Sequence, residues 1–155
     1  MPNDELAVTW KDVPDTLVVS VRFKGKHEEI DGHIDALSKL AGSYAAGDPI
    51  VLYRGGGDME VCLPVSRPVD GAESRTLEGG TMLCAPFRGH QGSPETGKAI
   101  GEEFGRLWKH TIEHHIGVTE EPWREVRVGV AGDDGAYEAE LQVPMLLPKW
   151  IGRLK

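Results

Sequence analysis

The feature that most constrains the fold is an internal repeat, in which the order strand-helix-strand-strand occurs twice along the chain. Apolar runs open the two copies at residues 17–23 and 82–87, and each run ends in a turn at a glycine. The first module covers about residues 16–66 and the second about residues 79–146, followed by a tail at 147–155. Two copies of one small unit predict a fold with approximate twofold symmetry.

Each copy contains one amphipathic helix. Apolar residues recur at spacings of three and four over residues 30–44, and Gly47 stops this pattern. In the second copy Ser93 is the predicted N-cap, Pro94 takes the first helical position and Gly117 ends the helix. The strands predicted after the helices are 49–54 with 59–65 and 122–130 with 137–145; a short strand at 6–10 precedes the first copy, and the polar stretch 66–80 is a predicted linker.

A module of this kind covers one face of its sheet with its own helix and leaves the other sheet face exposed. Joining the two modules into one antiparallel sheet, with both helices on one face, resolves this. The predicted fold is therefore α+β, a single domain of 155 residues. The symmetry axis leaves a central cleft between the modules, which is a usual place for a ligand.

Charge and composition exclude several classes of protein. The net charge is −8, from 25 acidic against 17 basic residues, which argues against direct nucleic-acid binding. No apolar run approaches the roughly 20 residues of a membrane span, and residues 1–5 do not begin a signal peptide, so we expect a cytoplasmic location. Cys62 and Cys84 lie in predicted strands and are expected to be reduced core thiols.

An ordered set of motifs in the chain resembles the GyrI-like small-molecule-binding domains, which also serve as effector-binding domains of AraC- and MerR-type regulators. The resemblance covers about residues 5–146. Its motifs are residues 51–53 and 60–65, then 77–82, 87–92, the pair Leu107-Trp108 and the strand start 121–126.

The resemblance implies a cleft between two pseudo-symmetric halves, lined by aromatic side chains, in which a buried acid receives cationic or polar aromatic compounds. In the family this acid lies on the strand after the second long helix, which here is Glu125. Many members carry an aromatic residue two positions later, where this chain has Arg127. Arg127 either neutralises the acid or points to solvent. No cofactor is expected.

The residues around Glu125 allow two interpretations. The period of two in a strand puts Trp123, Glu125 and Arg127 on one face. If that face lines the cleft, Glu125 holds a ligand cation or acts as a general acid/base. If it faces solvent, Val126 and Val128 point inward and Glu125 has no special role.

Other aromatic and polar residues are candidates for the same site. Trp108 and Trp123 form an aromatic wall for a flat ligand, although Trp108 also fits plain core packing. Tyr53 either offers its hydroxyl to a ligand or packs at a sheet edge. The remaining ligand-binding candidates are His90, Phe87 and Met82. His90 stands at a strand end, where organising the turn is a more usual role than chemistry. Phe87 and Met82 fit either the core or an adaptable cleft wall.

Two further patterns lie on the second helix. Gly97, Gly101 and Gly105 recur every four residues, which indicates either a close approach of this face to something else or a tolerated solvent face. His110 and His114 lie one turn apart, but no third ligand completes a metal shell, so no metal site is expected.

The leading hypothesis is a stand-alone small-molecule-binding protein for planar aromatic or cationic compounds. An alternative, implied by the resemblance, is a hydrolase of cyclopropane-containing toxins with Glu125 as the catalytic acid/base. A second alternative is a protein inhibitor of DNA gyrase, although the acidic residues are scattered rather than clustered. A protein partner could also meet the apolar tail at 146–151, which otherwise caps the sheet.

Overall fold

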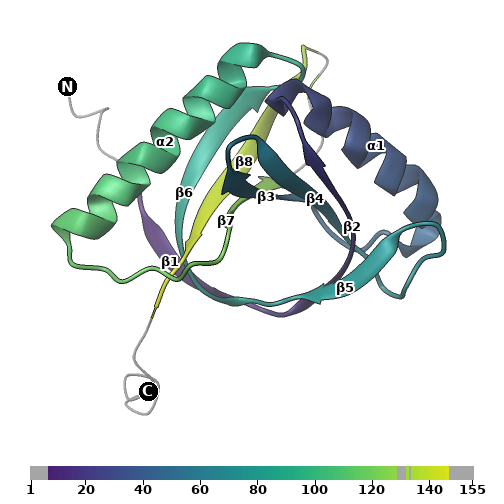
Figure 1. Cartoon of the computed structure of the whole chain (residues 1–155), viewed down its shortest axis with the longest axis horizontal. Helices are drawn as coiled ribbons and strands as arrows, with labels where there is room; N and C mark the ends of the chain where they lie inside the picture. Colours follow the sequence, from purple (N-terminus) through teal and green to yellow (C-terminus); the bar gives the residue numbers. More distant parts are fainter. Residues whose placement is uncertain (1–6, 129–131, 133, 147–155) are drawn as a thin grey trace.

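The computed structural model describes residues 7–128, 132 and 134–146. Within them, eight strands form one curled antiparallel sheet and two long helices lie on one of its faces (Figure 1). The strand order is β1-β6-β8-β7-β3-β4-β2-β5. The elements are β1 (Thr9–Val13), β2 (Thr16–Lys24), η2 (His27–Glu29), α1 (Ile30–Ala41), η3 (Gly42–Tyr44), β3 (Ile50–Gly55), β4 (Asp58–Pro64), β5 (Glu73–Leu77), β6 (Gly80–His90), α2 (Pro94–Glu113), β7 (Trp123–Val128) and β8 (Ala136–Pro144).

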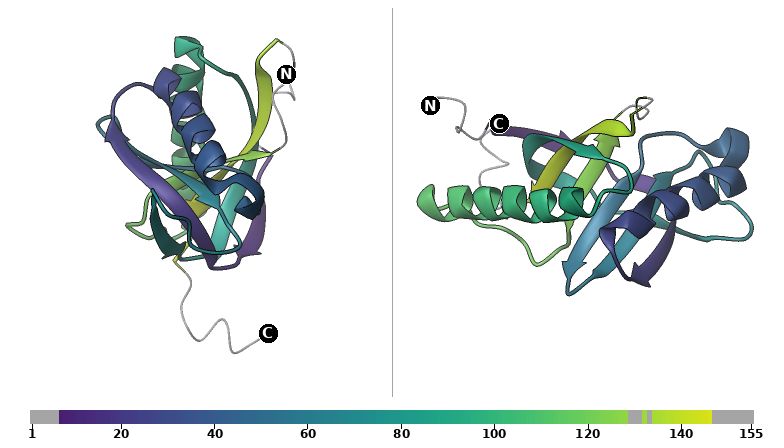
Figure 2. Two further views of the ribbon diagram at one scale, coloured as in Figure 1. Left: turned by 90° about the vertical axis from the view of Figure 1, so that its right-hand side faces the viewer. Right: turned by 90° about the horizontal axis from the view of Figure 1, so that it is seen from above.

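The predicted duplication is confirmed. The order β2-α1-β3-β4 is followed by β6-α2-β7-β8, and each helix lies over its own half of the molecule (Figure 2). The two halves meet where β3 pairs antiparallel with β7, with Val51 opposite Glu125. This single strand pair makes one continuous sheet of the two modules, as the predicted fold requires.

One additional strand and three element boundaries differ from the predictions. The stretch 66–80 is not only a linker, because Glu73–Leu77 forms the edge strand β5 against β2; its four polar residues at 73–76 hide this from an apolar pattern. The first strand lies at Thr9–Val13 rather than 6–10. The first helix ends at Ala41, because Gly42 has a φ of +54°, a left-handed conformation that favours glycine. The second helix begins at Pro94 as predicted and ends at Glu113, before Gly117.

The sheet has two distinct faces. The helix face includes Val51 and Leu141, which flank Glu125 on the neighbouring strands and belong to the clusters packed under α1 and α2, respectively. The inner face is the side around which the sheet curls, and it includes Leu52 and Gln142 on either side of Arg124. A cavity of about 400 Å³ lies on this inner face. It is lined by residues of β1 and of the segment just before β3, although β1 and β3 are far apart in the strand order.

Both cysteines are buried and free, as predicted. Cys62 and Cys84 are at most 1% exposed. Burial raises the pKa of each thiol to about 12, so both stay protonated and unreactive near neutral pH. No helix among the described residues is long and apolar enough to cross a membrane.

The glycine face of α2 combines a tight and an open position. A Cβ on Gly97 would lie 2.8 Å from the Cβ of His27, so α2 approaches η2 closely there. A Cβ on Gly101 or Gly105 would meet nothing within 4 Å. Close approach therefore explains one of the three glycines.

We predict that Gly101→Ala and Gly97→Ala change stability in different ways. Alanine at position 101 raises the free energy of unfolding by up to about 1 kcal/mol, the difference in helix propensity. Alanine at position 97 loses that gain, because His27 must shift to admit the methyl group. Urea denaturation of both variants measures the difference. Equal stabilisation by the two substitutions would contradict the close packing of α2 on η2.

Candidate functional site

Glu125 lies in the middle of β7 and is 0% exposed. The Tyr53 hydroxyl, from β3, donates a hydrogen bond of 2.8 Å to Oε1. The Tyr137 hydroxyl, from β8, donates one of 2.6 Å to Oε2. Since β3 and β8 flank β7 on either side, one residue from each module holds one oxygen of the carboxylate.

Arg127 pairs with Glu125 from two positions further along the same strand. Its Nε lies 3.4 Å from Glu125 Oε1, and its Nη1 lies 2.5 Å from Oδ1 of Asp31 on α1. The guanidinium also stacks over the Tyr137 ring at 4.3 Å. Arg127 is buried, so it neutralises an acid and does not point to solvent.

His27 covers the carboxylate from the side of the helices. Its Nε2 is 4.0 Å from Glu125 Oε1, and its ring stacks on Tyr53 with 6.4 Å between centroids. Both ring nitrogens are buried and have no hydrogen-bond partner among the described residues. Burial lowers the pKa of His27, so the imidazole is neutral at neutral pH. With Gly97 packed against it, His27 closes the site where the two helices converge (Figure 1).

The charges of this cluster do not cancel. In formal charges, the carboxylates of Glu125 and Asp31 count −2 and the guanidinium of Arg127 counts +1, while His27 is neutral, so the formal sum is −1. Burial and the neighbouring Glu125 raise the pKa of Tyr53 and of Tyr137, so both hydroxyls remain protonated donors. The site can therefore accept one positive charge.

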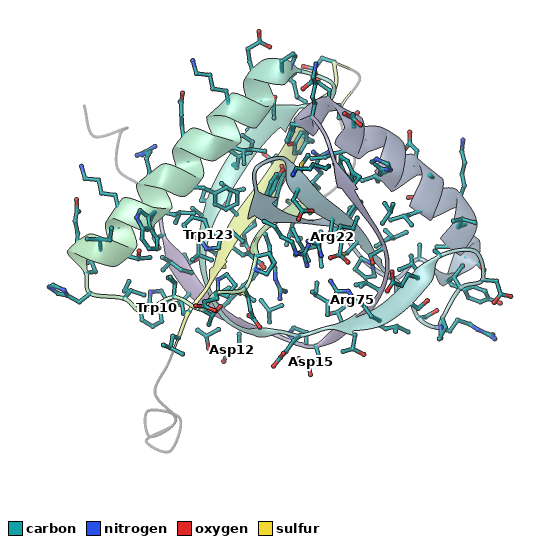
Figure 3. The ribbon with its side chains drawn as sticks, viewed as in Figure 1. Trp10, Asp12, Asp15, Arg22, Arg75 and Trp123 are labelled. Atoms are coloured by element: carbon teal, nitrogen blue, oxygen red, sulfur yellow. The ribbon has the colours of Figure 1, made fainter. Side chains whose placement is uncertain are left out.

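A row of aromatic rings leads away from this cluster. Centroid distances are 5.7 Å from Tyr53 to Phe104, 5.3 Å from Phe104 to Trp123 and 6.0 Å from Trp123 to Trp108. Trp123 lies between α2 and the centre of the sheet (Figure 3). Trp108 is 47% exposed, so it is not a plain core residue. The row thus connects the buried carboxylate with the surface.

The other predicted ligand-binding residues lie apart from this row. Phe87 is half-buried against the cluster under α2. His90 is exposed, and its backbone N–H and carbonyl bond to the Thr96 hydroxyl, which organises the turn before α2. Met82 is buried on the inner face, because it alternates with Leu83, which packs under α2. The structure therefore brings Tyr53, Trp123 and Trp108 towards Glu125 but leaves Met82 on the opposite side of the sheet.

The histidine pair on α2, His110 and His114, is stacked ring on ring. The rings of His110 and His114 stack at 4.1 Å, and His114 Nδ1 lies 3.0 Å from the His110 carbonyl. In the described part of the chain no group of three or more His, Cys, Asp or Glu side chains is placed to hold a metal ion.

Three residues of the site were missed in the sequence. Tyr137 had a recognisable signal, a polar aromatic residue at the start of a strand, but only the strand order places it beside β7. His27 follows the first glycine turn, and Asp31 lies in the first turn of α1. Their proximity to Glu125 depends on how the helices approach the sheet, which no local pattern encodes.

Comparisons with known proteins identify the architecture. No family model matches the sequence, and no curated protein matches it. Among solved structures, the C-terminal domain of EcmrR matches with a TM-score of 0.71 at 16% identity, over 92% of this chain and 99% of that one. SAV2435 bound to tetraphenylphosphonium matches with a TM-score of 0.57 at 14% identity, over 91% and 94%. The chain has the GyrI-like fold.

The chain is also similar to a solved structure that is described as a hydrolase. A hydrolase from Listeria innocua matches with a TM-score of 0.59 at 11% identity, over 90% of this chain and 91% of that one. At these identities the likeness establishes the fold, while the function must come from the site.

We predict that His27 makes stability depend on pH. Because burial lowers its pKa below 6.5, the unfolded chain takes up a proton that the folded chain resists. The contribution of His27 is therefore fully present above pH 6.5 and is lost as the pH falls from there towards the folded-state pKa. Denaturation between pH 7.5 and 5 should show a shallower decline for His27→Gln than for the wild type.

The control for this prediction is His90→Gln, which replaces an exposed histidine. Its stability should follow the wild-type pH profile. If His27→Gln and His90→Gln gave the same profile, His27 would not be a buried neutral imidazole.

Proposed function

We propose that the protein binds small cationic aromatic compounds, with Glu125 as the acceptor of the positive charge. The observation that carries this proposal is a fully buried carboxylate in a cluster whose charges sum to −1. A carboxylate inside a core costs free energy that an apolar residue would not. Such a group is expected where a ligand, rather than stability, determines the residue.

The aromatic row supports the proposal that the ligand is aromatic. Rings at Phe104, Trp123 and Trp108 offer flat surfaces for stacking and for cation–π contact. SAV2435, which has the same fold, is bound to tetraphenylphosphonium, a monocation that carries four phenyl rings. A ligand of that class would match both the single negative charge and the aromatic surface of this chain.

Binding at Glu125 requires the site to open. His27 covers the carboxylate and packs against Gly97 of α2, so we infer that η2 moves away from α2 when a ligand enters. Both nitrogens of His27 lack hydrogen-bond partners within the described ranges of the chain, which makes its buried position less favourable than that of a satisfied side chain. Tyr53 and Tyr137 keep the carboxylate oriented while the covering ring is displaced.

We predict that Glu125→Gln weakens binding of tetraphenylphosphonium at least about tenfold, since a charge-assisted contact is lost. Quenching of tryptophan fluorescence by the compound measures the affinity. Binding of triphenylphosphine oxide, a neutral compound with similar rings, should change much less. This comparison separates lost charge from a disturbed fold.

The matched control is Glu138→Gln, which removes a carboxylate that is 64% exposed and paired with Arg88. Its affinity for tetraphenylphosphonium should equal that of the wild type. If Glu125→Gln bound the cation as well as the wild type, Glu125 would not be the acceptor. If both variants weakened binding alike, only the overall charge would matter.

A hydrolase is the second candidate, because two tyrosine hydroxyls contact the carboxylate. In that reaction Glu125 takes a proton from water while the water oxygen bonds to one cyclopropane carbon, and the bond from this carbon to a neighbouring ring carbon breaks, leaving its electron pair on the neighbouring carbon. A tyrosine gives a proton to the released ring carbon and recovers one from Glu125. The raised pKa of both tyrosines makes them weak acids and favours binding over catalysis. Mass spectrometry of a cyclopropane-containing compound after incubation decides between an intact and a hydrated product.

A further inference from the structure

Arg124 is a buried cation on the inner face of the sheet, on the opposite side of β7 from Glu125. It is 4% exposed, and its Nη2 donates to the carbonyl of Glu78. Its Nε is buried and has no hydrogen-bond partner among the described residues, and no carboxylate there lies within ion-pair distance of it. A guanidinium in this state has given up water without a full replacement.

Arg124 lines a cavity of about 200 Å³ together with Arg54 of β3 and Arg75 of β5. Nη1 of Arg54 is also buried without a partner among the described residues. Arg54 and Arg75 are each paired with Glu60. Nη2 of each arginine lies 2.9 Å from one oxygen of the Glu60 carboxylate. Arg75 points into the space that the curled sheet encloses (Figure 3).

The acidic residues around this cavity do not fill the open donors. Glu60 is already held by two arginines. Glu78 and Glu121 also line the cavity, but both are exposed residues at its rim. Within the described part of the chain, the interior thus presents unpartnered guanidinium N–H groups from two neighbouring strands, while the carboxylates of Glu78 and Glu121 lie at the exposed rim. Guanidinium groups match carboxylate and phosphate oxygens in geometry as well as in charge.

We propose that this inner-face cavity, around Arg124 and Arg54, is a binding site for a small oxyanion, a carboxylate or phosphate group. The cavity is smaller than the roughly 300–1,000 Å³ of sites for drug-sized ligands, so the ligand is small or inserts only its anionic end. The site is separate from Glu125, because Arg124 and Glu125 are successive residues of one strand and point to opposite faces. It does not depend on the function proposed for the helix face.

The test follows the arginine Nε–H resonances of the ¹⁵N-labelled chain while sodium phosphate, and separately sodium acetate, replaces sodium chloride at constant ionic strength. The Arg124 signal is assigned by its loss in Arg124→Lys. The Arg124 signal should shift saturably with at least one anion. The anion that binds more tightly, phosphate or acetate, tells whether the site prefers a phosphate or a carboxylate ligand. The Arg22 signal is the control, because Arg22 is exposed and paired with Asp58.

Absence of a saturable Arg124 shift with both anions would overturn the proposal, as would an equal shift at Arg22. Glu121→Gln provides a second variant that leaves the interior intact, since Glu121 is exposed. Removal of this rim carboxylate should tighten anion binding about two- to fivefold, the usual range for an exposed charge. Unchanged affinity in Glu121→Gln would place the anion elsewhere.

Discussion

The pairing of β3 with β7 is the contact on which the rest of the structure depends. It joins two modules into one sheet and sets Glu125 opposite Val51, a core residue under α1. A carboxylate in that position is cut off from water and has to be satisfied by its neighbours. Tyr53 and Tyr137 on the two flanking strands do so, and Arg127 supplies the counter-charge. The buried polar cluster around Glu125 is thus a consequence of the pairing of β3 with β7.

The same strand gives the sheet opposite charges on its two faces. Glu125 lies in an excess of negative charge beneath the helices, while Arg124 lies among arginines on the inner face. Both side chains are at most 4% exposed. Adjacent residues of a strand point to opposite faces, so the two charges do not neutralise one another. The two proposed ligands follow from this arrangement, a cation for the helix face and an oxyanion for the inner face.

The fold was predictable where the pattern was local and repeated. The start of α2 follows from Pro94 at the first helical position, although the Ser93 hydroxyl donates to Glu95 rather than capping the helix, and the two strand pairs follow from apolar runs that flank glycine-containing turns. β5 was missed because an edge strand that carries polar residues at 73–76 has no apolar signature. The period of two placed Trp123, Glu125 and Arg127 on one strand face but left open whether that face is buried, which only the family resemblance favoured. The contacts of Tyr137, His27 and Asp31 depend on strand order and helix approach. Those arise only from the packed chain.

The most direct test of the account is a crystal structure of the protein with tetraphenylphosphonium. The account predicts the phosphonium beside the Glu125 carboxylate, its rings against Trp123 and Phe104, and His27 displaced from its place over the acid. A structure in which the cation is bound away from Glu125, with His27 still covering the carboxylate, would contradict it.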